Sequence, residues 1–339
     1  MKTAIVILNW NTREFLEKFL PGLLSSIRNI EGAEVVVADN ASSDGSLEYV
    51  KENHPEVKVI AFDKNHGYTG GYNMAIAQIM KEDSPEYIVL MNSDVEVQNG
   101  WLEPLVRKME STPDCGACAP KIHSWKERNK FEYAGAAGGH IDGFGYPFCR
   151  GRILDIVEDD YGQYDHITQK IFWGTGACLM VRSSLFMKLG GFDDRFFAHM
   201  EEIDLQWRMQ LAGWKIMVEP RSVVYHLGGG TLPVSARKIY LNHRNNLAML
   251  FKCSSPMQRM VVAIVRPFTD MVEALAHLVT LHPHRAWAVV KAWGTFIAWH
   301  KPLSAKRKAI KRIKTPQNIY PKSIVVRYLL GRKNFNNMI

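Results

Sequence analysis

Short apolar runs recur through the first hundred positions of the chain and alternate with stretches of helical spacing. The runs cover residues 4–8, 35–38, 57–62 and 87–91. Apolar residues at helical spacing separate the first two runs, and residues 72–80 lead another helical stretch into the fourth. Near-continuous apolar strands that alternate with helices are typical of a parallel sheet covered on both faces. The pattern therefore predicts an α/β fold.

Polar and often acidic residues follow each apolar run. They are Asn9-Trp10-Asn11, Asp39-Asn40, Asp63-Lys64-Asn65 and Asn92-Ser93-Asp94. Ligands of open α/β sheets bind beyond the carboxyl ends of the strands, so we expect these four ends to converge on one crevice. Asp94 and Glu96 form an acid-x-acid pattern whose oxygens suit Mg²⁺ or Mn²⁺ bound together with substrate phosphates. A solvated turn is the alternative.

A glycine-rich segment at residues 65–73 follows the third run and opens a helix. Backbone N–H groups in such a turn suit phosphate or sugar hydroxyls, although a tight turn with close helix packing explains the glycines equally well. The segment lacks the G-x-G-x-x-G spacing, which argues against the usual dinucleotide fold. Asp39 stands at a strand tip, where a carboxylate can accept the imide N–H of uracil or thymine.

The densest group of acids is Glu201, Glu202 and Asp204, directly before the helix-like residues 205–211. A helix N-terminus attracts carboxylates, and this explains one or two of them. A third, held near apolar side chains, would have a raised pKa and suit a general base. His226 follows a strand-like run and precedes three glycines; a lone histidine is more often structural than a metal ligand.

Charge is distributed unevenly along the chain. Residues 231–339 hold 19 Lys and Arg against two acids, which gives +17, so the first 230 residues sum to −9 from the total of +8. Residues 257–300 are helix-like, are interrupted by Pro267 and Pro283, and contain no run of about 18 apolar residues, so we expect no transmembrane helix. Five scattered cysteines make no disulfide framework and favour cytosolic exposure.

Six segments in the same order carry a family resemblance over about residues 3–250. They are VILNWNT, VVVADNASSDGS, KNHGYTGGYNMAI, VLMNSDVEV, FFAHMEEIDLQWRMQLAGWK and VVYHLGGGT. Together they resemble the family 2 glycosyltransferases, in particular the rhamnosyltransferase-like branch. The resemblance implies the GT-A fold, a Rossmann-like mixed sheet flanked by helices. It implies a nucleotide-binding half at about 1–110, an acceptor-binding half at 111–250, and a basic helical extension at 251–339.

The resemblance also implies roles for individual residues. Contacts to a UDP-, dTDP- or GDP-linked sugar donor fall on Asn9, Asn11, Asp39, Asn65, Gly70, Gly71, Asn73, Asn92 and Ser93. Asp94 matches the second acid of the family's DXD motif and would hold Mg²⁺ or Mn²⁺, while Asn92 replaces the first acid. His226 falls where many relatives complete the metal site.

The family's Glu-Asp pair aligns with Glu201 and Glu202, which makes Glu202 the implied base and leaves Glu201 and Asp204 as alternatives. Family members of this kind invert the anomeric centre, because the deprotonated acceptor attacks opposite the departing diphosphate. The Q-x-x-R-W signature of processive synthases is absent at residues 206–210, so the transfer of a single sugar is expected. A non-catalytic nucleotide- or saccharide-binding protein on the same fold is the alternative function.

The basic C-terminal third suggests a membrane partner. Aromatic residues between Trp287 and Trp299 precede Lys306-Arg307-Lys308, a combination that fits a peripheral helix on anionic lipid. A packed tail with solvated charges is the alternative. No nucleic-acid motif accompanies the charge, so no nucleic-acid partner is expected. We expect a saccharide or lipid-linked acceptor and a cytoplasmic protein, peripheral on the inner face of the inner membrane. Arg244 is expected at a phosphate or on a helix surface.

Overall fold

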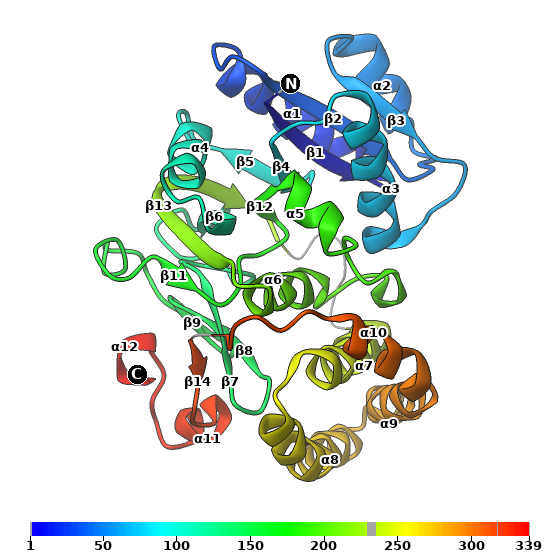
Figure 1. Ribbon diagram of the computed structural model, residues 1–339, viewed down its shortest axis with the longest axis vertical. Helices are drawn as coiled ribbons and strands as arrows, with labels where there is room; N and C mark the ends of the chain where they lie inside the picture. The colour runs from blue at the N-terminus through cyan, green and yellow to red at the C-terminus, as the bar shows by residue number, and fades with distance from the viewer. Residues whose placement is uncertain (1, 229–234, 317, 339) are drawn as a thin grey trace.

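A mixed nine-stranded sheet runs through the upper part of the molecule in the computed structural model, which describes residues 2–228, 235–316 and 318–338 (Figure 1). Its strand order is β11-β13-β6-β12-β4-β1-β2-β3, and β5 pairs with β13. The strands are β1 (Thr3–Asn9), β2 (Ala33–Asp39), β3 (Lys58–Ala61), β4 (Tyr87–Met91), β5 (Val95–Val97), β6 (Cys115–Ser124), β11 (Lys170–Ile171), β12 (Cys178–Arg182) and β13 (Lys215–His226).

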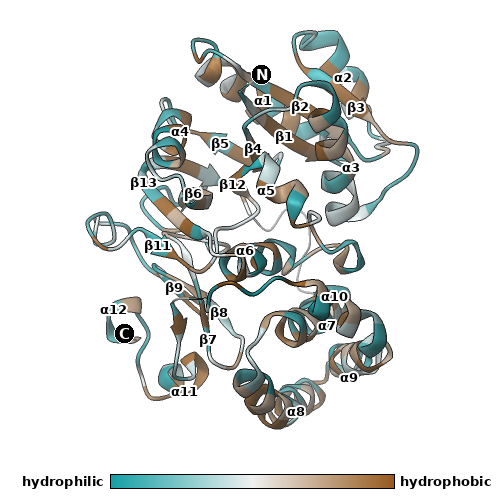
Figure 2. Cartoon of the chain, viewed as in Figure 1, coloured by the Kyte–Doolittle hydropathy of each residue, from teal (hydrophilic) through white to brown (hydrophobic). Residues whose placement is uncertain are grey.

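The four strands at the β3 end of this sheet are parallel, as the apolar runs predict. β1 pairs with β2 on one side and with β4 on the other, so the strand order reverses at β1. Helices cover both faces, and Figure 2 shows these strands as hydrophobic along their length. The helices of this half are α1 (Arg13–Ile27), α2 (Ser46–Asn53), α3 (Gly67–Glu82) and α4 (Leu102–Ser111).

The other half continues the sheet with antiparallel pairs around one parallel pair, β6 with β13. β12 runs antiparallel to β4, and β6 and β13 follow beyond it. Two short helices, α5 (Ser183–Lys188) and the 3₁₀ helix η1 (Asp194–Phe196), lead to α6 (Glu201–Leu211). The predicted mixed sheet flanked by helices is thereby confirmed. Cys115 and Cys118 both lie buried in β6 as free thiols.

A second, five-stranded sheet is formed mainly by residues 139–157. Its order is β10-β9-β8-β7-β14. Its strands are β7 (Gly139–Asp142), β8 (Pro147–Cys149), β9 (Arg152–Ile153), β10 (Ile156–Val157) and β14 (Ile319–Tyr320). β14 comes from the C-terminal region and pairs in parallel with β7, so the end of the chain packs back onto residues 139–157.

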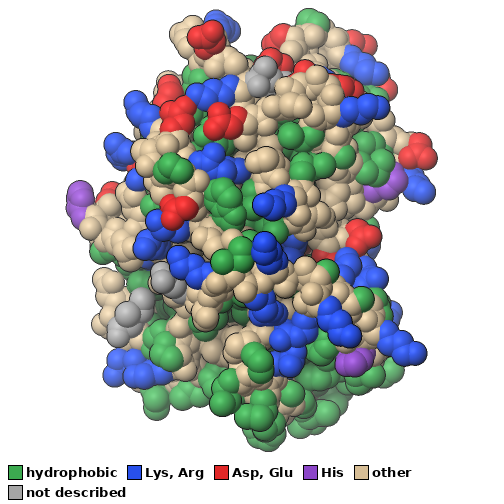
Figure 3. All heavy atoms as spheres, in the orientation of Figure 1, with side chains coloured by type: hydrophobic (Ala, Val, Ile, Leu, Met, Phe, Trp, Pro, Cys, Tyr) green, Lys and Arg blue, Asp and Glu red, His purple; other side chains and the backbone are tan. Residues whose placement is uncertain are grey.

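Helices make up most of the C-terminal region. They are α7 (Ala236–Cys253), α8 (Pro256–Val279), α9 (Pro283–Ala298), α10 (His300–Ala309), α11 (Ile324–Leu329) and α12 (Phe335–Met338). The boundary predicted at residue 250 falls inside α7. Figure 3 shows acidic side chains over the upper half of this face and Lys and Arg side chains gathered near α9 and α10. No helix in the described part of the chain is both long enough and apolar enough to cross a bilayer.

The expected interruption at Pro267 is wrong, because α8 continues through this residue. Proline removes one backbone donor and usually breaks a helix interior. Residues 263 and 267 are both exposed, so the carbonyl that loses its donor faces water, and a long surface helix tolerates this. Pro283, in contrast, stands in the first turn of α9, where a proline is favourable.

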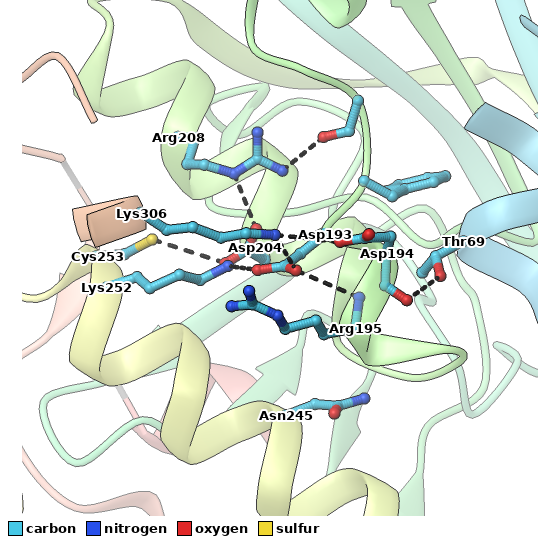
Figure 4. A network of polar contacts seen from close by, with 12 residues as sticks. Thr69, Asp193, Asp194, Arg195, Asp204, Arg208, Asn245, Lys252, Cys253 and Lys306 are labelled. Atoms are coloured by element: carbon cyan, nitrogen blue, oxygen red, sulfur yellow. Dashed lines mark hydrogen bonds and ion pairs between the residues drawn. The ribbon is translucent and has the colours of Figure 1, made fainter. Parts of the chain in front are cut away.

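A buried ionic cluster joins the C-terminal helices to the sheet half of the molecule (Figure 4). Lys252 of α7 lies 2.5 Å from a carboxylate oxygen of Asp193 and 2.8 Å from one of Asp204. Arg208 holds the other oxygen of Asp204 at 2.8 Å, and Lys306 of α10 holds the other oxygen of Asp193 at 2.5 Å. Burial raises the pKa of Asp193, but Lys252 and Lys306 lower it more, so its net pKa lies well below the usual range.

Replacing Lys252 with Met should therefore destabilise the fold strongly. The change leaves two buried carboxylates short of a cation, and breaking a buried ion pair in this way costs about 3–5 kcal/mol. The free energy of unfolding in urea at pH 7 measures this loss. Because the pKa of Asp193 is depressed in the fold, its contribution to stability is present above about pH 4 and declines as the pH falls further.

Lys311→Met is the control, because Lys311 is exposed. Its effect should stay within about 0.5 kcal/mol, as is usual for surface substitutions. Equal stabilities of the two variants would contradict the structural role of the buried cluster.

Candidate active site

The polar strand ends do meet at one edge of the sheet. Asn9 and Asp39 are direct neighbours across β1 and β2. Ile7 of β1 is level with Met91 of β4, so residues 92–94 leave the sheet beside Asn9. This edge lies at the point where the strand order reverses, which is where open α/β sheets bind ligands.

Asp39 lies at the centre of a closely tied turn. Its Oδ1 accepts a hydrogen bond from Asn9 Nδ2 at 2.7 Å, and its Oδ2 accepts one from the backbone of Ser42 at 2.9 Å. Asn11 has a left-handed φ of 53° and accepts a bond from the backbone of Ser43 at 2.8 Å. These bonds fix the Asp39 carboxylate at the strand tip and leave further acceptor capacity on both of its oxygens.

The glycine-rich segment packs tightly against its surroundings. Asn65 Oδ1 accepts from the backbone of Gly67 at 2.7 Å, at the start of α3. A Cβ on Gly71 would lie 2.7 Å from Leu8 Cδ1, and one on Gly70 would lie 3.1 Å from His66 Cβ. Helix α3 thus approaches β1 more closely than a larger residue at 71 allows.

Asn73 is already used within the chain. Its Nδ2 donates to the carbonyl of Phe192 at 3.0 Å, and its Oδ1 accepts from the Phe192 N–H at 2.9 Å. Both ends of the amide therefore fasten α3 to the segment before α6. The donor contact expected for Asn73 stays a prediction beside this structural role.

Asp94 and His226 form a buried pair at the edge. Asp94 is 3% exposed, and its Oδ1 lies 3.1 Å from His226 Nε2. The pairing of β5 with β13 brings them together, since His226 is level with Val95. Asp94 Oδ2 is buried, and no described residue gives it a hydrogen bond. A buried carboxylate oxygen without a donor is costly unless a cation reaches it.

Glu132 completes this arrangement from a part of the sequence with no recognisable pattern. It is 8% exposed, and its Oε1 lies 3.4 Å from Nδ1 of His226. The imidazole is thus placed between two carboxylates. Burial lowers the pKa of His226, but Asp94 and Glu132 raise it more, to about 10. Glu132 is a lone acid in an irregular segment, so the sequence offers no signal for it.

Glu96 does not join Asp94 as the acid-x-acid pattern predicts. Its two oxygens accept from the guanidinium of Arg128 at 2.8 Å each, and one also accepts from Trp125 Nε1 at 2.7 Å. Within residues 2–228, 235–316 and 318–338, no three His, Cys, Asp or Glu side chains are arranged to hold a metal ion. Of the residues that the sequence predicts as metal ligands, Asp94 and His226 lie together as a pair.

The second acidic group begins α6. Residues Phe197, His199 and Met200 precede it with left-handed φ values of 65°, 72° and 69°. Strained backbone of this kind clusters at functional sites. Glu201 is almost fully buried, and both burial and the neighbouring Glu202 raise its pKa well above the usual range.

Glu202 has the more moderate shift. Burial raises its pKa to about 7, while backbone N–H groups partly oppose the rise. Oε2 of Glu202 has no hydrogen-bond donor in the described part of the chain. A carboxylate with this pKa and a free oxygen can accept a proton at neutral pH.

Asp204, the third acid, is not free for such a role. Arg208 and Lys252 hold its two oxygens at 2.8 Å each in the buried cluster of Figure 4. Its position as an alternative base is therefore corrected to a structural one. Arg244 is likewise internal, since it donates to the carbonyls of Phe196 and Arg195 at 2.8 and 3.1 Å rather than facing a phosphate.

Residues 176 and 177 contact both the acidic group at the start of α6 and the turn that carries Asp94. A Cβ on Gly176 would lie 3.9 Å from Glu202 Cβ and 2.6 Å from the hydroxyl of Tyr68. The next residue, Ala177, accepts a bond from the backbone of Asn92 at 3.0 Å. Residues 176 and 177 thus stand between Glu202 and the turn that carries Asp94. Tyr68, from the glycine-rich segment, donates its hydroxyl to the carbonyl of Gly176 at 3.0 Å.

The chain is an α/β protein with a mixed sheet. At one edge of that sheet lie the hydrogen-bonded Asp39, the Asp94–His226 pair and Glu202, a carboxylate with a raised pKa. The model of glycosyl transferase family 2 matches residues 4–190, and the chain belongs to that family.

Similar proteins agree with this assignment. The chain is 27% identical over 261 residues to N-acetylglucosaminyl-diphospho-decaprenol L-rhamnosyltransferase of Mycobacterium tuberculosis, covering 73% of this chain and 83% of the relative. It is 23% identical to rhamnosyltransferase WbbL of Escherichia coli strain K12, covering 66% of this chain and 82% of that protein. The predicted resemblance is confirmed, and the chain is a glycosyltransferase.

Solved structures share the fold. GalNAc-T7 with UDP, GalNAc and Mn²⁺ superposes with a TM-score of 0.59 at 16% identity, covering 79% of this chain and 50% of that one. The S. aureus TarS 1–349 complex with UDP-GlcNAc gives a TM-score of 0.57 at 15% identity, covering 90% and 84%. The predicted GT-A fold is thereby confirmed.

Proposed function

We propose that the protein is an inverting, metal-dependent glycosyltransferase that moves one sugar from a nucleotide-sugar to a hydroxyl of a saccharide or lipid-linked acceptor in cell-surface polysaccharide synthesis. The observation that carries this proposal is the proximity of two unlike groups, the Asp94–His226 pair and Glu202, on either side of residues 176 and 177. One side suits a diphosphate with a cation, and the other suits an acceptor hydroxyl.

Asp94 and His226 would hold Mg²⁺ or Mn²⁺, with His226 giving up the proton that Asp94 and Glu132 stabilise in the absence of the ion. The fit is supported by the buried Asp94 Oδ2 without a donor and by ligand chemistry, since carboxylate oxygen and imidazole nitrogen both suit Mn²⁺. Few protein ligands are needed where substrate phosphates fill other positions. When bound, the ion neutralises negative charge on the departing nucleoside diphosphate. Glu132 would orient His226 through Nδ1, as carboxylates commonly do for metal-bound histidines.

Glu202 is the proposed base. Its carboxylate takes the proton of the acceptor hydroxyl. The acceptor oxygen then bonds to the anomeric carbon while the bond from that carbon to the diphosphate breaks on the opposite face. Glu201 is less suited, because its strongly raised pKa keeps it protonated at neutral pH. With a pKa of about 7, Glu202 is substantially ionised there.

The donor nucleoside is proposed to lie along the edge that bears Asn9, Asn11 and Asp39. The spare acceptor capacity of Asp39 supports a contact to a uracil or thymine imide, and UDP- and GDP-linked sugars occupy neighbours of the same fold. The relative from M. tuberculosis is named for a lipid-diphosphate-linked saccharide, which supports an acceptor at a membrane. A peripheral location on the cytoplasmic face of the inner membrane follows from that acceptor.

Release of nucleoside diphosphate from UDP-, dTDP- or GDP-linked sugars tests the reaction. With Mn²⁺ or Mg²⁺ and an acceptor extract, one donor class should give turnover, and Asp94→Ala or Glu202→Gln should reduce it at least 100-fold. Glu96→Gln is the matched control, since Glu96 lies two residues from Asp94 but pairs with Arg128, and it should retain activity. Nucleotide binding without any turnover would favour the alternative, a non-catalytic binding protein.

The pH profile of kcat/KM tests the assignment of the base. Because Glu202 must be ionised to accept a proton, activity should rise with pH through about 7 and level off above it. Glu202→Gln should lose this rise along with most activity, whereas Glu201→Gln should keep it. A rise that persists unchanged in the Glu202 variant would assign the base elsewhere.

The affinity for Mn²⁺ tests Glu132 without any turnover. In the presence of nucleoside diphosphate, Glu132→Gln should weaken Mn²⁺ binding by about 10–100-fold, because outer carboxylates orient metal-bound histidines. Isothermal calorimetry measures the dissociation constant. Glu127→Gln, an exposed acid of the same segment, serves as control and should bind Mn²⁺ as the wild type does. Equal affinities in both variants would remove Glu132 from the site.

A further inference from the structure

Helix α8 exposes a continuous apolar stripe to solvent. The members of this α8 stripe are Met257, Met260, Ile264, Phe268, Met271, Val272, Leu275, Leu278 and Val279, each at least half exposed. Apart from the adjacent pairs 271–272 and 278–279 they recur at intervals of three or four, so they share one side of a 24-residue helix about 36 Å long. The opposite side is buried and carries Val262, Arg266, Asp270 and Ala274.

A stripe of this size calls for a partner. Single exposed apolar residues are common, but contiguous patches of several hundred Å² mark interaction surfaces. Leu281 and Trp287, 86% and 65% exposed, extend the apolar surface toward α9. Figure 3 shows hydrophobic side chains gathered at the lower end of the molecule, where Figure 1 places α8.

Charge around the stripe favours an anionic partner. The two acids of residues 231–339 are Asp270 and Glu273, and both are already paired. Asp270 is buried against Arg266 at 3.1 Å. Glu273 lies 3.2 Å from His243 and 3.8 Å from His277. Neither acid is left to repel a negatively charged surface.

A basic hollow adjoins the N-terminal end of the stripe. Its charged and titratable lining is Arg259, His300, Arg307, Lys308 and Arg312. Arg307 and Arg312 donate to backbone carbonyls, so Arg259 and Lys308 are the cations offered to a phosphate. Arg259 stands between Met257 and Met260 in the chain. None of the described lining residues is acidic. Burial and the neighbouring Arg312 and Arg259 lower the pKa of Arg307, as expected where cations lack a counter-ion.

The membrane-facing segment expected from the sequence needs revision. Lys306 is held by Asp193 and Asp194, and Arg307 donates to the carbonyls of Phe251, Lys252 and Ser254. Trp293 donates to buried Asp270 at 3.0 Å. Lys306, Arg307 and Trp293 therefore stabilise the fold, and most of the exposed apolar surface lies on α8.

We propose that the α8 stripe lies in the surface of an anionic lipid bilayer, with the basic hollow placed over lipid phosphates. An apolar helix face flanked by cations is the chemistry of an interfacial helix, which buries its stripe in the acyl boundary while basic residues meet the head groups. The inference deepens the proposed function, on which it rests for the membrane-linked acceptor. It assigns the surface that meets the lipid.

The arrangement connects this surface to the site. α8 follows α7, whose Asn245 donates to the carbonyls of Phe196, Ala198 and His199 at 2.7–3.0 Å. Those residues lead directly to Glu201 and Glu202. Docking of α8 therefore fixes the orientation of the acceptor side of the site relative to the bilayer.

Co-sedimentation with vesicles tests the stripe. The full chain should sediment with phosphatidylcholine–phosphatidylglycerol vesicles and much less with phosphatidylcholine alone. The double variant Ile264→Glu, Phe268→Glu should bind at least 10-fold more weakly, because both side chains are more than 70% exposed and become charged without disturbing the core. The matched control, Ile167→Glu with Met187→Glu, adds the same charge at other exposed apolar positions and should bind normally.

A second pair of variants tests the hollow. Arg259→Gln with Lys308→Gln should weaken binding to the anionic vesicles about 25-fold, since each cation near the surface contributes roughly fivefold. Binding to phosphatidylcholine alone should change little. An equal loss on both vesicle types would overturn the placement of lipid phosphate over the hollow.

Two further readouts separate this inference from the proposed reaction. Nucleoside diphosphate release with a water-soluble acceptor should persist in the Ile264, Phe268 variant, which also shows that it folds. If the wild type binds vesicles but releases no nucleoside diphosphate, the reaction fails and the membrane surface stands. The inference would be overturned if the wild-type protein did not bind anionic vesicles. It would also be overturned, in favour of a protein contact, if sedimentation velocity showed a wild-type dimer and a monomeric variant.

Discussion

The buried ammonium group of Lys252 is the interaction on which the arrangement of this molecule depends. It neutralises Asp193, which precedes the strained segment before α6, and Asp204, which lies within α6. Removing three charges from water costs free energy, and this cost is offset only when all of them are paired. Lys252 belongs to α7, so the helix that carries Glu202 takes its position from the C-terminal region. The catalytic half and the basic extension are therefore one structure around this cluster.

The same helix turn shows how neighbouring carboxylates acquire different properties. Asp204 is fully buried, yet Lys252 and Arg208 compensate its charge. Glu201 and Glu202 have no such cation, so burial raises the pKa of both. When nearby acids lie in different environments, their pKa values differ, and each acid can then serve a different role. Asp204 anchors the helix, and Glu202 remains available to take a proton near neutral pH.

Much of the sheet and its ligand edge follows from the sequence, because strand period, buried runs and polar strand ends are local signals. Asn9, Asp39 and Asp94 reach one edge for that reason. The sequence does not reveal which polar side chains form hydrogen bonds with residues far away along the chain. Asn73 is bound to Phe192 and Glu96 to Arg128, across 119 and 32 positions. Glu132 stands in an irregular segment and is recognised only through His226.

The same limitation applies to the cations from which charge alone predicts a membrane-facing segment. Composition counts the cations near α10, but it cannot show that Lys306 and Arg307 are used inside the fold. Apolar spacing along α8 predicts an amphipathic helix, and that spacing is the same whether the apolar side covers a core or meets lipid. Here the buried side of α8 contains the Arg266–Asp270 pair. A helix that buries its ion pair and exposes Ile264 and Phe268 has the opposite polarity to a surface helix in water, and this inversion is the observation behind the lipid surface that we propose for α8.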